Sequence, residues 1–348
     1  MLARIRLTGF EPFGEHDVNI SESLANRLIG REMKVDLDPT PPFGLESRTV
    51  TLDFEGEILS VDAEGGRRST EHLQGIDAII HLGLKENATR IHIEICAVNE
   101  CDFRTADNAG RQANEIPVIE GGLNLLHTTA HHPSFNLAFA DSDEVVISED
   151  CGRFVCNETY YHTLHGIETR GCEVRGRALP ALFVHLPPGE ILAIERQQEI
   201  LLDIAARLVQ KPTIQVVGGV IVDPQGRMLA CRRASSEEMG GWWEFPGGKI
   251  EADESETSAL ARELREELGL DVVVGECLGR HGHDYGSMVV ELAFFACQAD
   301  GQELSLKVHD EVRWITEDQI AEIEWLPPDV TFAERLAEAG FQALRDSS

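Results

Sequence analysis

The sequence predicts an α/β protein made of two domains, and three observations support this. The chain has 348 residues, which at roughly 100 to 200 residues per domain is enough for two full cores. In its N-terminal part, apolar strand-like runs alternate with helical segments, the pattern of a layered α/β fold. An amphipathic helix is expected at 190–212 and ends at Lys211-Pro212, because proline disfavours helix at the residue before it. We therefore place the boundary there, with domains at 1–211 and 212–348.

The N-terminal strands are expected at four apolar runs: 3–10, 77–84, 144–148 and 181–187. Three reactive residue types lie at or near the ends of apolar runs, namely Glu94, Cys156 and His185. An imidazole can generate a cysteine thiolate, and a carboxylate can hold that imidazole in the tautomer required. The alternative for Cys156 is a buried, inert core thiol.

Four stretches of the sequence, in the same order as in the family, together resemble pyroglutamyl peptidase I. Four such matches are unlikely by chance, which favours a functional role for Glu94, Cys156 and His185. The stretches are LTGFEPFGEHDVNIS (7–21), IEICAVNECDFRTADNAGRQ (93–112), SEDCGRFVCN (148–157) and FVHLPP (183–188). The resemblance covers residues 1 to about 208. It implies an α/β/α layered domain that needs no cofactor and removes N-terminal pyroglutamate from short peptides. The alternative is a retained fold without turnover.

The same resemblance assigns roles to individual residues. Cys156 would be the nucleophile, His185 its base and Glu94 the acid that orients the base. Arg104 would lie near the oxyanion. The flat lactam pocket would be bounded by Phe10, Phe13 and Phe154. Relatives of this kind often form tetramers, so a homo-oligomer is an expectation from resemblance alone.

Residues 248–270 fit the pattern G-x5-E-x7-R-E-U-x-E-E-x-G-U, with U aliphatic, at every fixed position. The segment ETSALARELREEL within it favours helix. Residues 263, 266 and 267 then share one helix face, where three carboxylates repel unless a hard divalent cation lies between them. This arrangement indicates a metal site, and the fit to the whole pattern indicates one that cleaves pyrophosphate bonds. The alternative is a solvated acidic helix face. The charged and glycine positions of the pattern are Gly248, Glu254, Arg262, Glu263, Glu266, Glu267 and Gly269.

This segment resembles the Nudix box, and its surroundings resemble the MutT-like branch, which hydrolyses nucleoside triphosphates to monophosphate and pyrophosphate. The resemblance covers roughly the last 135 residues and includes an expected strand at 218–233 and the stretches 242–250 and 309–315. It implies an α+β domain with a mixed sheet between helices. The ligands of Mg²⁺ or Mn²⁺ would be the Gly247 carbonyl, Glu263, Glu266 and Glu267, with Glu266 and Glu267 also catalytic. Arg262 would orient the carboxylates, with Gly248 and Glu254 in support.

Three residues define the expected base pocket. Arg233 matches a position that contacts the purine, and Phe245 would line the base. Asp329 falls where relatives read the base edge, and an ionised Asp only accepts hydrogen bonds, which favours guanine-type N–H groups or the cytosine amine. Two substrates therefore stay open, 8-oxo-dGTP for nucleotide-pool sanitation and a cytidine nucleotide. Arg233 as a solvated surface cation and Phe245 as plain core are the alternatives.

One position departs from the MutT-like pattern. Relatives carry Glu where this chain has Val308, as a further metal ligand or base. Asp310 or Glu311 is expected to substitute. If neither reaches the metal, slow turnover with nucleotide binding retained is expected. The alternative function is then a catalytically weak nucleotide sensor that regulates the peptidase half.

Composition limits the partners. Lys and Arg total 30 against 61 Asp and Glu, a formal charge of −31, which should repel nucleic-acid polymers but not one metal-neutralised nucleotide. No run of 18 or more apolar residues and no signal-peptide core occur, so no membrane association and a cytoplasmic location are expected. The 8 cysteines lack zinc-type spacing and should be reduced thiols.

Overall fold

The computed structural model describes residues 1–14, 17–37, 48–237, 239–251, 254–285, 288–299 and 304–341. They divide into two units, the first of which extends to Pro212 while the second begins at Thr213. Each unit has hydrophobic clusters of its own.

The first unit is built on a seven-stranded sheet with the order β2-β3-β1-β4-β11-β5-β8. Its central strands are parallel, while β2 is antiparallel to β3 and β5 to β11. The strands are β1 (Leu2–Phe10), β2 (Glu32–Leu37), β3 (Arg48–Leu59), β4 (Ala78–Leu84), β5 (Ile91–Glu94), β8 (Val145–Ser148) and β11 (Ala181–Leu186). The four expected strands are therefore confirmed as β1, β4, β8 and β11.

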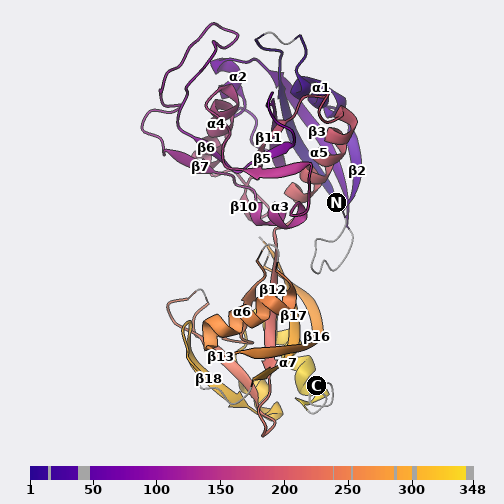
Figure 1. Ribbon diagram of the computed structural model, residues 1–348, viewed down its shortest axis with the longest axis vertical. Helices are drawn as coiled ribbons and strands as arrows, with labels where there is room; N and C mark the ends of the chain where they lie inside the picture. The colour runs from indigo at the N-terminus through magenta and orange to yellow at the C-terminus, as the bar shows by residue number, and fades with distance from the viewer. Residues whose placement is uncertain are drawn as a thin grey trace. The chain divides into compact units, whose positions relative to one another are not determined.

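Helices cover both faces of this sheet, which confirms the α/β/α layering (Figure 1). One face packs against α1 (Ile20–Leu28) and α5 (Ile194–Val209). The other packs against α4 (Val155–Arg170), which α2 (Ala63–Arg68) adjoins. The smaller elements are β6 (Cys96–Val98), β7 (Leu125–His127), α3 (His132–Ala138), β9 (Glu173–Val174) and β10 (Arg177–Ala178).

The helix expected at 190–212 is α5, which begins later and ends earlier than expected. The Pro188 carbonyl accepts hydrogen bonds from the N–H groups of Ile191 and Leu192, so a turn occupies the expected start. At the other end Gln210 is extended, two positions before Pro212.

The second unit has a mixed four-stranded sheet in the order β15-β12-β17-β16, in which β12 and β17 are parallel. The unit also has a three-stranded sheet with the strand order β14-β13-β18. Cluster residues from β12 and β17 pack against α6 on one face and α7 on the other, which confirms the α+β fold. The elements are β12 (Thr213–Ile221), β13 (Met228–Arg233), β14 (Trp243–Glu244), β15 (Gly247–Lys249), α6 (Glu256–Leu268), β16 (Val272–Asp284), β17 (Val289–Ala299), β18 (His309–Ile315), η1 (Glu317–Glu322) and α7 (Pro327–Ala339).

The prediction of a single strand at 218–233 is wrong, because a turn divides this segment between β12 and β13. The Asp223 carboxylate accepts hydrogen bonds from the N–H groups of Gln225 and Arg227, at 2.9 and 2.8 Å. Gly226 supplies the positive φ of 80° that the turn needs.

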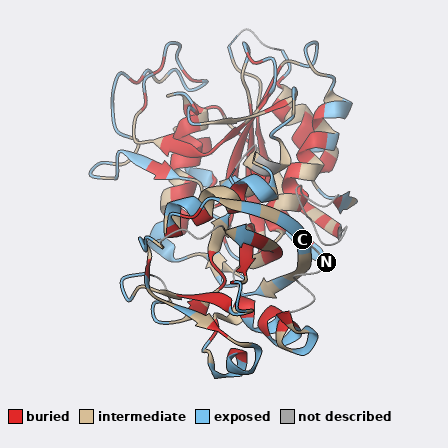
Figure 2. Ribbon diagram, turned by 60° about the horizontal axis from the view of Figure 1, so that its bottom comes forward, coloured by how far each residue is buried: buried red, intermediate tan, exposed pale blue. Residues whose placement is uncertain are grey.

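Buried residues gather on the sheets and on the inner helix faces within each unit (Figure 2). Among the described residues, no helix is both long and apolar enough to cross a membrane.

Candidate active sites

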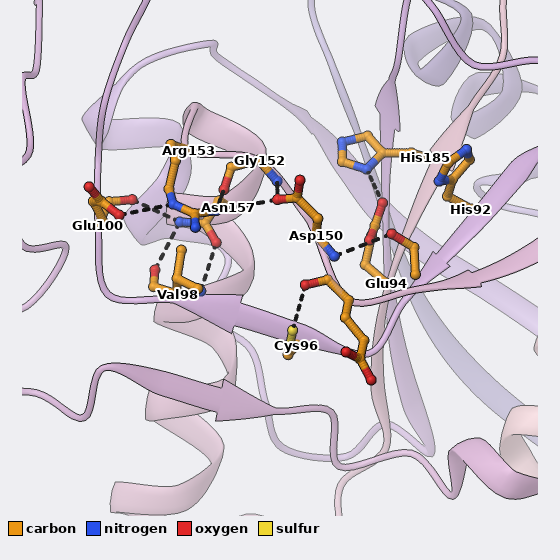
Figure 3. A network of polar contacts seen from close by, with 12 residues as sticks. His92, Glu94, Cys96, Val98, Glu100, Asp150, Gly152, Arg153, Asn157 and His185 are labelled. Carbon is orange, nitrogen blue, oxygen red and sulfur yellow. Dashed lines mark hydrogen bonds and ion pairs between the residues drawn. The ribbon is translucent and has the colours of Figure 1, made fainter.

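The first candidate site depends on strand alternation in β5 and β11. Ile93 and Val184 belong to the cluster beneath α1 and α5, so their neighbours Glu94 and His185 point to the opposite face, toward α4. There the His185 Nδ1 atom lies 2.7 Å from Glu94 Oε1 (Figure 3). Both side chains are almost fully buried. With Nδ1–H donated to the carboxylate, Nε2 is left to accept a proton.

Glu94 is held ionised although it is buried. Burial raises its pKa, but the hydrogen bond and charge of His185, together with Ser148 and Lys85, leave the pKa below its usual value. The Lys85 Nζ atom lies 3.6 Å from Glu94 Oε1. The strand-end position of Lys85 gave no sequence signal for this contact.

Cys156 is at the start of α4, and its neighbour fixes that start. The Asn157 side chain accepts a hydrogen bond from the Val98 N–H and donates to the carbonyls of Val98 and Glu100, all within 2.9–3.0 Å (Figure 3). These contacts tie the first turn of α4 to β6. The thiol is therefore presented at a helix N-terminus, where the helix dipole favours a negative charge.

The Cys156 sulfur lies directly over β4. A Cβ atom added to Gly83 would be 2.9 Å from Cys156 Sγ and 2.8 Å from the Phe183 ring, so only glycine allows this approach. Gly83 is the strand partner of His185, which brings thiol and imidazole to one place in the sheet. Both residues line a cavity of about 120 Å³.

This cavity is mainly apolar and contains the three aromatic residues expected from the sequence. Its lining residues are Phe10, Phe13, Asn19, Val61, Leu84, Cys151, Phe154, Val155, Cys156 and His185. Phe13 and Phe154 contact each other with ring centroids 5.8 Å apart. Such walls suit a small flat ring with few polar groups.

Two features differ from the simplest picture of a cysteine site. Burial, with the charge of Glu94, raises the pKa of Cys156 to about 12, so the resting thiol keeps its proton and needs an acceptor such as His185. Arg104 is exposed, and it is not among the described residues that line the cavity. The structure therefore does not bring Arg104 to the site.

The second candidate site is organised by α6, whose limits match the expected helical segment. The Ser255 side chain caps its start by accepting from the Ser258 N–H, and Gly269 ends it with a φ of 70°. Arg262 ties this helix to the preceding loop. Its guanidinium donates to both oxygens of Glu254, to Glu263 Oε1 and to the Lys249 carbonyl, at 2.9–3.0 Å.

The glycines before the helix allow close backbone approach. A Cβ atom on Gly248 would lie 2.4 Å from the Glu263 carboxyl carbon, and one on Gly247 would lie 2.0 Å from the Val217 carbonyl oxygen. Gly247 also has a φ of 151°, which other residues rarely adopt. The strand β15, which contains both glycines, therefore lies directly on the carboxylate face of α6.

The three α6 carboxylates have different environments. Arg262 lies 2.9 Å from Glu263 and 3.6 Å from Glu266, and the Glu266 side chain is 62% exposed. Glu267 is the most enclosed, and its buried Oε2 atom has no hydrogen-bond partner in the described part of the chain. Burial raises the pKa of Glu267 to about 7; His309 and the Gly247 backbone oppose this, while Glu244 and Glu263 add to it.

These residues suit a hard divalent cation. Their donors are oxygens, and one of these oxygens is buried without a partner among the described residues. Gly247 and Gly248 of β15 leave no space for a side chain beside them. Within the residues described, the α6 carboxylates do not already gather into a cluster of three close ligands. Like-charged carboxylates separate when nothing neutralises them, so a cation would draw them together.

The expected base-pocket residues lie near one further carboxylate, Glu244. Arg233 Nη1 donates to Glu244 Oε2 at 2.8 Å, so Arg233 is paired and not simply a solvated cation. Burial raises the pKa of Asp329 well above its usual range, and Glu244 adds to the effect. A raised pKa favours the protonated carboxyl, which can donate as well as accept a hydrogen bond, whereas the sequence suggested an ionised group that only accepts.

Phe245 is in the hydrophobic core, which favours the alternative reading. Its ring is stacked on Trp325 with centroids 4.9 Å apart and also packs against Phe294 and Phe332. Only 4% of Phe245 is exposed. Sequence reasoning also missed Glu244 and His309, whose contact joins segments far apart in the chain.

Fold and sites together define a two-unit hydrolase, with a Cys-His-Glu site in the first unit and an acidic oxygen-donor site in the second. The Pyroglutamyl peptidase family model matches residues 3–201 and the NUDIX domain model matches residues 212–345. The chain belongs to the pyroglutamyl peptidase family. In this chain the peptidase domain is followed by a NUDIX domain.

Named relatives match each half separately. The CTP pyrophosphohydrolase of Escherichia coli (strain K12) is 33% identical over 38% of this chain and 93% of its own length. The 8-oxo-dGTP diphosphatase of Proteus vulgaris is 37% identical over 29% of this chain and 89% of its own. The pyrrolidone-carboxylate peptidase of Bacillus cereus (strain Q1) is 29% identical over 53% of this chain and 77% of its own.

Proposed function

We propose that the chain is a bifunctional hydrolase that removes N-terminal pyroglutamate with its first unit and releases pyrophosphate from a nucleoside triphosphate with its second. The peptidase proposal is supported above all by the buried Glu94–His185 pair beside Cys156. The nucleotide proposal is supported above all by Glu267 on the acidic face of α6, whose buried Oε2 has no hydrogen-bond partner among the residues that the structure describes.

In the first unit, His185 Nε2 takes the proton of Cys156, and the sulfur attacks the amide carbonyl that follows the lactam ring. The amine leaves with a proton from His185, and water then hydrolyses the acyl-enzyme. Glu94 keeps the imidazole oriented and stabilises its charged form. Phe10, Phe13 and Phe154 hold the ring.

A pyroglutamyl reporter tests this in the full chain. Cys156→Ala should abolish cleavage and leave pyrophosphate release unchanged. Cys172→Ala is the control, because Cys172 is also a free, partly buried thiol but does not line the cavity. If Cys156→Ala cleaves the reporter as fast as the wild type does, Cys156 is not the nucleophile. If the wild type does not cleave the reporter, the first unit is a retained fold without turnover.

In the second unit, Glu263, Glu266, Glu267 and the Gly247 carbonyl are the groups that would hold Mg²⁺ or Mn²⁺. When bound, the cation would supply Lewis-acid chemistry and neutralise phosphate charge. Glu267 would accept a proton from the water consumed. Arg262 and Glu254 hold the loop and helix together, and Arg233 and Asp329 would meet the base.

The preferred nucleotide follows from a panel of 8-oxo-dGTP, dGTP, dCTP, 5-methyl-dCTP and CTP with Mg²⁺. We favour 8-oxo-dGTP, and the cytidine nucleotides are the second candidate because of the relative named CTP pyrophosphohydrolase. Glu267→Gln should remove pyrophosphate release, whereas the exposed control Glu276→Gln should not. Tight nucleotide binding without product in wild type, together with a changed peptidase rate, would instead indicate a sensor.

A further inference from the structure

Position 308 carries valine, and the two carboxylates that follow it are committed to arginines on the surface. Arg232 Nε donates to Asp310 Oδ1 at 2.7 Å, and Arg232 Nη1 lies 2.8 Å from Glu311 Oε2. Arg313 Nε also donates to Glu311, at 2.6 Å. The expectation that Asp310 or Glu311 substitutes at the metal site is therefore not supported by their contacts.

His309, which lies between Val308 and Asp310, points inward instead. The Lys307 N–H donates to the Glu267 carbonyl at 3.1 Å, and the Val308 carbonyl accepts from the Ala234 N–H at 3.2 Å. The chain thus passes from the end of α6 to the end of β13 within two residues. His309 follows at once and its side chain is 0% exposed.

One ring nitrogen of His309 is fixed by Glu244. His309 Nε2 lies 2.9 Å from Glu244 Oε1, while the other oxygen of Glu244 accepts from Arg233. A carboxylate that pairs with a guanidinium is an acceptor, so the Nε2 atom carries the hydrogen. The Nδ1 atom is then left with its lone pair.

Two buried acceptors remain without partners in the described chain at this place. They are His309 Nδ1 and Glu267 Oε2. The hydrogen bond from the Lys307 N–H to the Glu267 carbonyl brings the chain to Glu267 two residues before His309. Two acceptors cannot satisfy each other, but one water molecule can donate a hydrogen to each.

We propose that His309 is a positioning residue that, together with Glu267, holds the water consumed in pyrophosphate release, and that Glu244 fixes the ring tautomer this requires. The inference rests on the proposed nucleotide activity. The water oxygen bonds to a phosphorus of the α–β bridge, the bridging P–O bond breaks, and one water proton passes to Glu267. The products are nucleoside monophosphate and pyrophosphate.

Two substitutions separate the roles of the ring nitrogens. In His309→Asn the amide takes the place of Nδ1 and loses the contact with Glu244, whereas His309→Gln places its amide near Nε2 and loses the Nδ1 atom. We expect His309→Gln to lower kcat about 10- to 100-fold with KM changed less than about twofold, and His309→Asn to retain more activity. His283→Asn and His283→Gln are matched controls on β16. Equal losses in both His309 variants, or a rise in KM alone, would overturn the proposal.

A second measurement does not depend on turnover. Long-range ¹H–¹⁵N spectra of the full chain with labelled histidine, assigned by difference from His309→Gln, report the tautomer of His309 among its 13 histidines. We expect hydrogen on Nε2 and a lone pair on Nδ1. Turnover with the opposite tautomer would refute the role of His309 alone, whereas the expected tautomer without pyrophosphate release from any nucleotide would refute the proposed activity and, with it, the water-holding role.

Discussion

Glu94 in the first unit and Glu267 in the second are both enclosed carboxyl groups, yet their pKa values move in opposite directions. Glu94 has His185 and Lys85 beside it, and its pKa is below the usual value. Glu267 is surrounded by Glu244 and Glu263 and is buried, and its pKa rises to about 7. Burial alone favours the neutral form, so the sign depends on which charges accompany it.

This difference shows how each site is completed. The first contains its own counter-charge and needs only a substrate. The second has excess negative charge on one helix face, with a buried oxygen atom that no described residue satisfies. The divalent cation proposed for this site would supply the missing positive charge.

The largest effect is expected where the first site depends on its internal charge. Glu94→Gln replaces the acceptor of His185 Nδ1–H with a neutral amide, which no longer stabilises the imidazolium. We expect kcat for pyroglutamyl cleavage to fall about 10³- to 10⁴-fold, with pyrophosphate release unchanged. Glu71→Gln, at an exposed position in the same unit, is the control. A loss below about tenfold would mean that Glu94 does not orient the base.

A smaller loss is expected where the second site is held by hydrogen bonds around the acidic face. Arg262→Lys removes the paired contacts to Glu254 and weakens the connection between Glu263 and β15. We expect pyrophosphate release to fall about 10- to 100-fold and to need more Mg²⁺ for half-saturation. Arg265→Lys is the matched control, since it lies on the same helix and pairs with exposed Asp271. Equal effects in both would show that helix charge alone matters.

Local signals in the sequence account for much of both sites. The composition of ETSALARELREEL predicted the extent of α6, and the apolar run at 181–187 placed His185 on a strand. Contacts between distant segments gave no such signal. The Lys85–Glu94 and Glu244–His309 contacts depend on how the strands pair, and the Phe245 ring is buried because Trp325 and Phe332 pack over it.

Arg104 and Asp329 illustrate two further limits. A motif position does not determine whether a loop brings its side chain inward, and Arg104 remains exposed. Residue type does not determine protonation, and burial raises the pKa of Asp329 well above that of a surface carboxyl. Tertiary structure decides both.

Packing around the first site gives a third, more modest prediction. Gly83→Ala places a methyl group against Cys156 Sγ and the Phe183 ring, which must shift. We expect a loss of about 1–3 kcal/mol in unfolding free energy of the first unit and a several-fold loss of pyroglutamyl cleavage. In Gly189→Ala the added atom would meet only Ile20, at 3.6 Å, so this control should change neither. Unchanged activity in Gly83→Ala would mean that the thiol tolerates displacement.

The smallest expected effect is the dependence of stability on pH, and it should differ in sign between the units. Glu94 has a lowered pKa, so its contribution is present above the usual carboxyl value of 4.5 and is lost as the pH falls through the folded-state value. Glu267 has a raised pKa, so its contribution is complete below 4.5 and is lost as the pH rises toward about 7. Calorimetry in a chelating buffer should show the second transition weakening from pH 5 to 7, about the interval between these values. Glu267→Gln should remove the pH dependence of unfolding of the second unit and leave the loss of stability of the first unit at acid pH unchanged. Glu94→Gln should reduce the acid-pH loss in the first unit and leave the second unit unchanged. A slope in the second transition that survives Glu267→Gln would assign it to another group and remove the contrast between the two carboxyls.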